Sequence, residues 1–231
     1  KCVIRILATG DVGVRKITDL GMTPYNYDRF SRLIKVPQGV MLVTGPTGSG
    51  KTTTLYAALG ELAKPNVNVI TVEDPVEKNI EGINQCQVNA KAGMTFAAAL
   101  RSILRQDPDI VMVGEMRDQE TAEIAIRAAI TGHMVLSTLH TNDAASTITR
   151  LVDMGVAPYM VATSLIGIVA QRLCKVVCNE CKTPRMSTPE ENELLGITES
   201  ATIYDACGCP KCNNTGYTGR TAIHEILLCT H

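Results

Sequence analysis

The chain has 231 residues, of which 45% are apolar, and a formal net charge of −1 at pH 7. Its length and apolar content are sufficient for one large globular domain, or for a domain with an appendage. The near-zero charge argues against a general nucleic-acid or membrane-surface binder, because such proteins usually carry a basic excess. No run of 18 apolar residues and no signal peptide occurs, so we expect no transmembrane helix.

The predicted elements alternate between strands and helices. Residues 2–7 have strand character directly after Lys1, so we expect the chain to be a piece of a longer protein. A helix follows at 25–34, between Pro24 and Pro37. The apolar runs 40–43, 67–72, 110–113 and 134–139 are typical of strands buried on both faces of a parallel sheet. Helices are predicted between and after them, at 52–62, 96–105, 121–130 and 144–153.

The pattern changes after about Gln171. Cysteine, proline and asparagine are frequent as far as Asn214, with one short helix predicted at 189–195. Strand character returns at 221–228. The chain is therefore predicted to be an α/β protein with a mostly parallel sheet and a small metal-stapled insertion.

A glycine-rich segment after the strand at 40–43 matches the pattern G-x-x-x-x-G-K-[ST] and precedes a predicted helix, as a phosphate-binding P-loop does. Its backbone N–H groups are expected to point at phosphate oxygens, Lys51 to reach the β- and γ-phosphates, and Thr52 to bind Mg²⁺. The predicted nucleotide-binding residues are Gly45, Thr47, Gly48, Ser49, Gly50, Lys51, Thr52 and Thr53.

Acidic residues end two of the predicted strands, Glu73 and Asp74 in one case and Glu115 in the other. Carboxyl ends of parallel strands lie at one edge of a sheet, where ligands bind. We expect Glu115 to activate water, and Glu73 and Asp74 to position Mg²⁺ or to assist that water. The alternative is that these acids merely cap loops.

Two of the four histidines bracket the strand at 134–139. His140 follows the strand and is expected at the active site, where an imidazole donates hydrogen bonds to a phosphate. His133 precedes it, roughly 20 Å away at the usual strand rise, and is expected to be structural or to lie at a subunit boundary.

Two C-x₂-C pairs, Cys178 with Cys181 and Cys209 with Cys212, are separated by 27 residues. Each pair presents two thiolates, and four thiolates complete a tetrahedral, structural Zn²⁺ site. Free or redox-active thiols are the alternative. We expect the neighbouring Cys174 and Cys207 to be packing residues.

Four segments in order resemble the Walker A, Asp, Walker B and His boxes of the secretion ATPases, and more narrowly of the assembly ATPases of type II secretion and type IV pili. They are GPTGSGKTTT (45–54), VEDPVE (72–77), LRQDPDIVMVGEMRD (104–118) and TGHMVLSTLHTNDA (131–144). The resemblance implies the roles already given to Glu115 and Glu73, and the His box maps onto His133 and His140.

The same resemblance implies a RecA-like ATPase that uses ATP, Mg²⁺ and structural Zn²⁺, forms a homo-hexamer, and is cytoplasmic and peripheral to the inner membrane through a platform protein. It implies a remnant of a missing N-terminal domain at 1–7, an ATPase core at 8–173, a zinc subdomain at 174–216 and a continuation of the C-terminal domain at 217–231. The tetracysteine element, followed by GYTGR (216–220), favours pilus extension or secretion over retraction.

Four arginines are candidates to stabilise γ-phosphate charge, in cis or from a neighbouring subunit. They are Arg101, Arg105, Arg117 and Arg150. For each of them, a solvated or salt-bridged helix face is the alternative.

Two other functions remain open from the sequence. One is a DNA-handling motor of the conjugation type, although the net charge and the 3% aromatic content offer little for nucleic-acid binding, which we do not expect. The other is a zinc-stapled interaction module that uses nucleotide only as a switch.

Overall fold

The structure, a computed structural model, describes residues 15–229. The strand predicted at 2–7 and the domain remnant predicted at 1–7 lie outside the described residues. The α-helices are α1 (Pro24–Leu33), α2 (Lys51–Leu62), α3 (Phe96–Ile103), α4 (Gln119–Ile130), α5 (Ala144–Asp153), α6 (Pro158–Ser164) and α7 (Pro189–Leu195), and the 3₁₀ turns are Ile17–Leu20, Ala90–Ala92 and Pro210–Cys212. The strands are β1 (Gly39–Thr44), β2 (Val69–Glu73), β3 (Asn84–Gln87), β4 (Ile110–Val113), β5 (Met134–Leu139), β6 (Leu165–Val177), β7 (Lys182–Met186), β8 (Thr202–Ala206) and β9 (Tyr217–Leu228).

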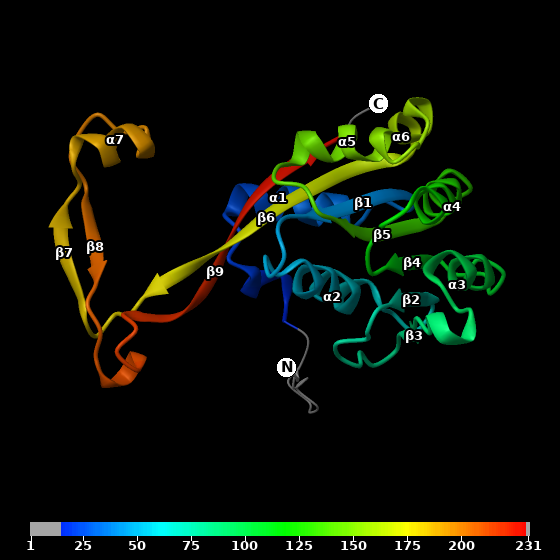
Figure 1. The fold of residues 1–231 in the computed structure, drawn as a ribbon, viewed down its shortest axis with the longest axis horizontal. Helices are drawn as coiled ribbons and strands as arrows, with labels where there is room; N and C mark the ends of the chain where they lie inside the picture. Colours follow the sequence, from blue (N-terminus) through cyan, green and yellow to red (C-terminus); the bar gives the residue numbers. More distant parts are fainter. Residues whose placement is uncertain (1–14, 230–231) are drawn as a thin grey trace. The chain divides into compact units, whose positions relative to one another are not determined.

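The described chain divides into two compact units. The larger unit contains residues 15–172 and 222–229, and the smaller one contains 173–221. Strands β6 and β9 each contribute residues to both units. Figure 1 shows the elements of both units.

The larger unit is built on a seven-stranded sheet in the order β3-β2-β4-β5-β1-β6-β9. The pairs that β1 forms with β5 and β6 are parallel, as are those that link β3, β2, β4 and β5. The order places β1, with the glycine-rich segment after it, in the inner part of the sheet. The predicted α/β class with a mostly parallel sheet is confirmed.

Two apolar clusters cover the two faces of this sheet. One joins the sheet to α3, α4, α5 and α6, and the other joins it to α1 and α2. All residues of β1, β2, β4 and β5 are buried, which explains why these strands have continuous apolar runs instead of alternation.

Side-chain caps explain where several helices begin. Thr23, Thr95, Asp118, Asp143 and Thr188 each accept a hydrogen bond from the backbone N–H three residues on, at the start of α1, α3, α4, α5 and α7. These bonds satisfy donors that the first helical turn leaves free. Helix α2 is different, because Gly50 precedes it in the left-handed conformation (φ 88°) and supplies no side chain.

The sequence reasoning found most of the sheet but missed several elements. Strands β3, β6, β7 and β8 and helix α6 were not predicted. Strand β3 is short, polar and only partly buried, so it lacks an apolar signal. In β6 the apolar run contains Gly167, which packs closely against Leu33, since a Cβ there would lie 2.4 Å from Leu33 Cδ2. Predicted strand 221–228 begins earlier, at Tyr217.

The smaller unit contains the antiparallel pair β7 and β8 together with α7. Arg185 of β7 binds Glu191 of α7 (2.6 Å) and Asp205 of β8 (3.0 Å), and so ties all three elements together. Its guanidinium lowers the pKa of Glu191 to about 2. Within 15–229, every helix is too short or too polar to cross a bilayer.

Candidate active site and metal centre

The glycine-rich segment forms a turn between β1 and α2, as predicted. Gly45, Gly48 and Gly50 have φ angles of 143°, 77° and 88°, a region that side-chain-bearing residues rarely adopt. Gly50 is the N-cap of α2, so the backbone N–H groups of the turn and of the first helical turn lie at the positive end of the helix dipole. This geometry is that of an anion-binding loop.

The Lys51 side chain folds back over this loop. Its Nζ atom donates hydrogen bonds to the carbonyl oxygens of Gly45 (2.9 Å) and Pro46 (3.1 Å). Burial lowers the pKa of Lys51, and the nearby Glu115 carboxylate opposes that shift. Thr52 lies one residue on, with its hydroxyl 3.5 Å from a carboxylate oxygen of Glu77.

A residue of β6 also contacts the loop. The Gln171 amide donates from Nε2 to the Ser49 carbonyl oxygen (2.7 Å) and accepts from the Thr54 hydroxyl at Oε1 (2.7 Å). Gln171 is 3% exposed. Sequence reasoning missed this residue, although a lone amide at the end of the apolar run 165–170 was a usable signal.

Glu115 lies beyond the end of β4, in a group of charged side chains. Its carboxylate is bonded to Arg117 and lies 3.6 Å from His140 Nε2, and Arg117 in turn lies 3.7 Å from Asp74. Burial raises the pKa of Glu115, but Arg117, His140 and Lys51 outweigh it, so the pKa is lower than its ordinary value. The structure thus brings the predicted residues Lys51, Asp74, Glu115 and His140 to one edge of the sheet.

Glu73 has a different environment from Glu115. It is 3% exposed, and its carboxylate accepts hydrogen bonds from the hydroxyls of Tyr56 and Thr71 (2.6 Å for Thr71) and from the Gln85 amide (3.0 Å). These contacts occupy both carboxylate oxygens and join α2, β2 and β3. The Tyr56 oxygen also accepts from the Glu77 N–H (3.3 Å), which ties the 74–77 loop to the same network.

The remaining predicted residues are more scattered. Arg101 pairs with Glu120 at 2.6 Å. Arg105 is exposed just after α3, and Arg150 is exposed on α5. His133 Nδ1 lies 2.9 Å from the carbonyl oxygen of Ala128, at the end of α4. Of the four candidate arginines, the structure therefore places only Arg117 beside Glu115.

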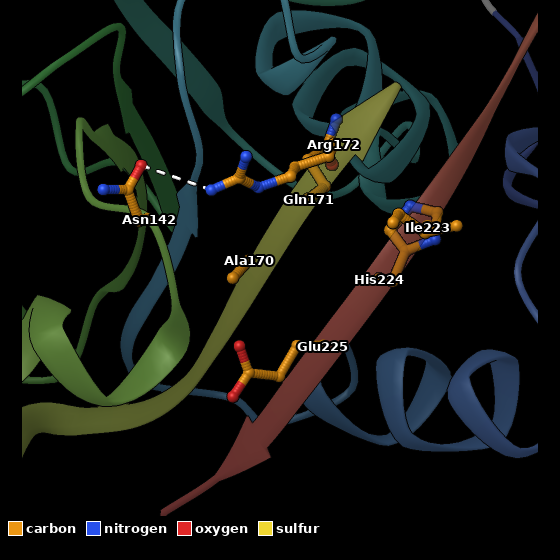
Figure 2. Close-up of a pocket in the computed structure, with 7 residues that line it drawn as sticks. All are labelled: Asn142, Ala170, Gln171, Arg172, Ile223, His224 and Glu225. Atoms are coloured by element: carbon orange, nitrogen blue, oxygen red, sulfur yellow. Dashed lines mark hydrogen bonds between the residues drawn. The ribbon is translucent and has the colours of Figure 1, made fainter. Parts of the chain in front are cut away.

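A pocket of about 230 Å³ lies beyond Gln171, where β6 and β9 meet the loop after β5. In Figure 2, Gln171 and Arg172 project from β6 opposite Ile223, His224 and Glu225 of β9, and the Arg172 guanidinium donates a hydrogen bond to Asn142 (3.4 Å). Burial lowers the pKa of His224. Gln171 thus both lines this pocket and bonds to the glycine-rich loop.

The four predicted metal-ligating cysteines form one cluster in the smaller unit. All four sulfur atoms lie within 4.8 Å of one another, and three pairs are 3.8 or 3.9 Å apart. Zn–S bonds of about 2.3 Å in a tetrahedron require sulfur atoms about 3.8 Å apart. The spacing of the four thiols therefore fits a zinc ion.

Backbone N–H groups around the cluster point at the sulfurs. Cys181 Sγ accepts from Gly208 (3.2 Å), and Cys212 Sγ accepts from Cys209 (3.1 Å) and Gly216 (3.2 Å). Burial opposes ionisation of Cys212, but the N–H donors and the neighbouring thiols outweigh it and lower the pKa of Cys212, whereas burial and neighbouring thiols raise the pKa of Cys181. Such donors stabilise the thiolate form that a metal requires.

The prediction for Cys174 and Cys207 was wrong. Both side chains are exposed, so neither is a packing residue. Cys174 lies in the part of β6 that extends beyond the buried core, and Cys207 follows β8 with its sulfur 3.2 Å from the Thr183 hydroxyl.

Comparison with known proteins identifies the family. The family model described as "Type II/IV secretion system protein" matches residues 1–231. The chain belongs to this family. The ATPase E of the type II secretion system of Vibrio cholerae is 57% identical over 211 residues, which cover 90% of this chain and 42% of that protein. The type IV pilus assembly ATPase PilB of Thermus thermophilus is 52% identical over 232 residues, which cover 99% of this chain and 26% of PilB.

The chain thus spans less than half the length of these secretion-family relatives. Among solved structures, the pilus retraction motor PilT with bound ADP is 32% identical, with a TM-score of 0.71 over 96% of this chain and 55% of PilT. The ATPase DotB of Legionella pneumophila is 26% identical, with a TM-score of 0.66 over 94% of this chain. The predicted membership of the secretion ATPase family is confirmed.

Proposed function

We propose that the chain is the ATP-hydrolysing part of a motor that drives type IV pilus assembly or type II protein secretion. The observation that carries this proposal is the glycine-rich loop with Lys51 folded over it. The Glu115 carboxylate lies near enough to Lys51 that each side chain affects the pKa of the other. The names of the relatives, ATPase E and PilB, support the ATPase activity and both alternatives for the system that is served.

Each group near the loop has a distinct role in the proposed reaction. The backbone N–H groups of residues 45–53 bind the phosphates, and Lys51 exchanges its carbonyl partners for phosphate oxygens. Glu115, a carboxylate beside Arg117 and His140, takes a proton from the attacking water. His140 lies beside Glu115 and donates to the γ-phosphate.

Mg²⁺, when bound, supplies positive charge that offsets the developing charge on the phosphates. The residues suited to hold it are Thr52, through its hydroxyl, and Asp74, through its half-exposed carboxylate. Glu73 acts by positioning, because its carboxylate is occupied by Tyr56, Thr71 and Gln85, and it supports the 74–77 loop through Tyr56.

Arg117 holds Glu115 and Asp74 in place and stabilises phosphate charge from the same position. Arg101, Arg105 and Arg150 are exposed, and we propose that they act across a subunit boundary.

We also propose a division of the chain into an ATPase core at 8–173, a zinc subdomain at 174–216 and a continuation of the C-terminal domain at 217–231. Zn²⁺ held by Cys178, Cys181, Cys209 and Cys212 would be structural, because four thiolates leave no open position for a substrate. The spacing of the sulfurs and the N–H donors that point at them support this assignment.

The working assembly that we propose is a cytoplasmic homo-hexamer, which attaches peripherally to the inner membrane through a platform protein. Nucleic acid is not a proposed partner, because the net charge of −1 and the low aromatic content offer little for phosphate neutralisation or base stacking. Membership of the secretion family supports the proposed hexamer and its membrane attachment. Salt-dependent binding of DNA would contradict the proposal that nucleic acid is not a partner.

Steady-state hydrolysis by the full-length protein tests the proposal. Lys51→Ala removes the cation over the P-loop and is expected to abolish ATP binding, while Lys64→Ala, an exposed lysine after α2, is the matched control. Glu115→Gln is expected to lower kcat at least 100-fold with nucleotide binding retained. Its matched control is Glu61→Gln, at an exposed position on α2.

Full turnover by Glu115→Gln would rule out this residue as the base. Nucleotide binding without measurable turnover in the wild-type hexamer would favour the zinc-stapled switch module instead.

A further inference from the structure

Gln171 is a buried amide that the proposed catalytic groups do not include. It lies in β6, where the apolar run 165–170 ends, and it reaches the P-loop from a position 122 residues later in the chain than Ser49. Its side chain is 3% exposed and uses both of its functional atoms, Nε2 as donor to the Ser49 carbonyl and Oε1 as acceptor from Thr54.

The contacts of Gln171 are distributed along the whole loop. The side chain holds Ser49, near the end of the loop, and Thr54, in the first turn of α2. The backbone carbonyl oxygen of Gln171 lies close to Gly45, where the loop begins. A Cβ on Gly45 would be only 2.3 Å from this oxygen. Gln171 therefore contacts both ends of the loop and the first turn of α2, which limits their movement.

A glycine-rich loop needs such support from outside. Glycine residues have more backbone freedom than others, so the loop loses more entropy when it closes around a phosphate chain. An anchor that holds the loop in its binding shape before the ligand arrives removes part of that cost and raises affinity. The anchor must donate to one partner and accept from the other, which an amide does and a carboxylate or an alkyl group does not.

We propose that Gln171 is a positioning residue that holds the P-loop in its phosphate-accepting shape and thereby sets nucleotide affinity. Both functional atoms of its side chain are occupied by Ser49 and Thr54, so we expect its effect to fall on nucleotide binding and not on the chemical step. The inference rests on the proposed function, since it requires that the loop binds a nucleotide.

The test compares Gln171→Leu and Gln171→Glu with wild-type full-length protein. Leucine removes both hydrogen bonds at similar volume, and glutamate keeps the acceptor but sets a carboxylate oxygen against the Ser49 carbonyl. Loss of these buried bonds is expected to raise the Kd for a non-hydrolysable ATP analogue, and the KM for ATP, by about tenfold or more. The value of kcat is expected to change by less than about threefold, because Glu115 is untouched.

Cys174→Ser is the matched control, because it changes an exposed position three residues further along the same strand. It is expected to leave Kd, KM and kcat unchanged. A folded Gln171→Leu protein with the wild-type Kd, or with a lowered kcat and an unchanged KM, would overturn the proposal.

Thr54 provides a second route if the Gln171 variants do not fold. Thr54→Val removes the hydroxyl that donates to Gln171, while Thr54→Ser retains it. Valine is expected to weaken nucleotide binding and serine to leave it unchanged, and equal affinities of the two variants would overturn the proposal. A wild-type protein that binds no nucleotide would refute the proposed function itself, whereas normal wild-type binding with unaffected variants refutes only the role of Gln171.

Discussion

The hydrogen bond from Tyr56 to Glu73 offers the sharpest test of how the active-site edge is stabilised. Burial raises the pKa of Tyr56, and the Glu73 carboxylate raises it further, so the phenol stays protonated and donates. Tyr56→Phe removes this donor without changing the ring, which packs in the apolar cluster beneath α2. The change leaves Glu73 with only the Thr71 and Gln85 donors, and it removes the acceptor for the Glu77 N–H.

The expected cost follows from the charge of the acceptor. Hydrogen bonds to charged groups contribute about 1.5–3 kcal/mol, and more is lost when the remaining partner is buried. Since the phenylalanine ring leaves no cavity, we expect the free energy of unfolding to fall by about 2 kcal/mol. For a protein of this size that corresponds to a fall in Tm of about 4–8 °C.

Urea denaturation followed by circular dichroism measures the loss directly, and the m-value should stay constant if only stability changes. Tyr159→Phe is the matched control, because Tyr159 is 69% exposed at the start of α6. We expect that change to alter stability by less than about 0.5 kcal/mol. A loss of equally small size in Tyr56→Phe would refute the idea that the Glu73 network holds α2, β2 and β3 together.

Three further predictions concern individual charges and thiols. Arg117→Gln removes the principal group that lowers the pKa of Glu115, so the acidic limb of the pH–rate profile should move to higher pH. Cys212→Ser should abolish the binding of one zinc ion per chain, measured by metal analysis, and should unfold residues 173–221 without unfolding the parallel sheet. Arg185→Gln should raise the pKa of Glu191 from about 2 towards its ordinary value, as measured by NMR titration. Because the folded pKa of Glu191 is depressed, its contribution to stability is complete above pH 4.5 and is lost as the pH falls towards 2. Arg185→Gln should make this contribution smaller, because only the Thr188 hydrogen bonds still lower the pKa.

Matched changes separate these effects from general damage. Arg127→Gln, at an exposed position on α4, should leave the pH–rate profile in place, and Cys174→Ser should retain the zinc. Lys211→Gln breaks the neighbouring ion pair with Glu180 and should leave the titration of Glu191 unchanged. An unshifted acidic limb, a retained zinc ion or an unshifted Glu191 would contradict the corresponding prediction.

Features that depend on neighbouring residues were readable from the sequence. The strand at 40–43, the glycine-rich turn and the helix after it follow from hydrophobic runs and from glycines that permit positive φ angles. The four cysteines were recognised because two C-x₂-C pairs are a local pattern, and they do converge. The capped helices α3, α4 and α5 were also predicted to within two residues at either end.

The environment of each charged group was decided by the tertiary structure alone. Both acids were predicted to end buried strands, but Glu73 is the last residue of β2 and is enclosed by Tyr56 and Gln85. Glu115 lies two residues beyond β4 and faces Arg117 and His140.

The support of the P-loop by Gln171 joins residues 117 and 122 positions apart. The sequence by itself therefore determined which segments form the glycine-rich loop, the buried strands and the thiol cluster, because turns and hydrophobic periods are properties of short stretches. Which carboxylate is enclosed by hydrogen-bond donors and which amide bonds to the loop depend on the order in which strands lie side by side, and strand order arises only when distant segments pack.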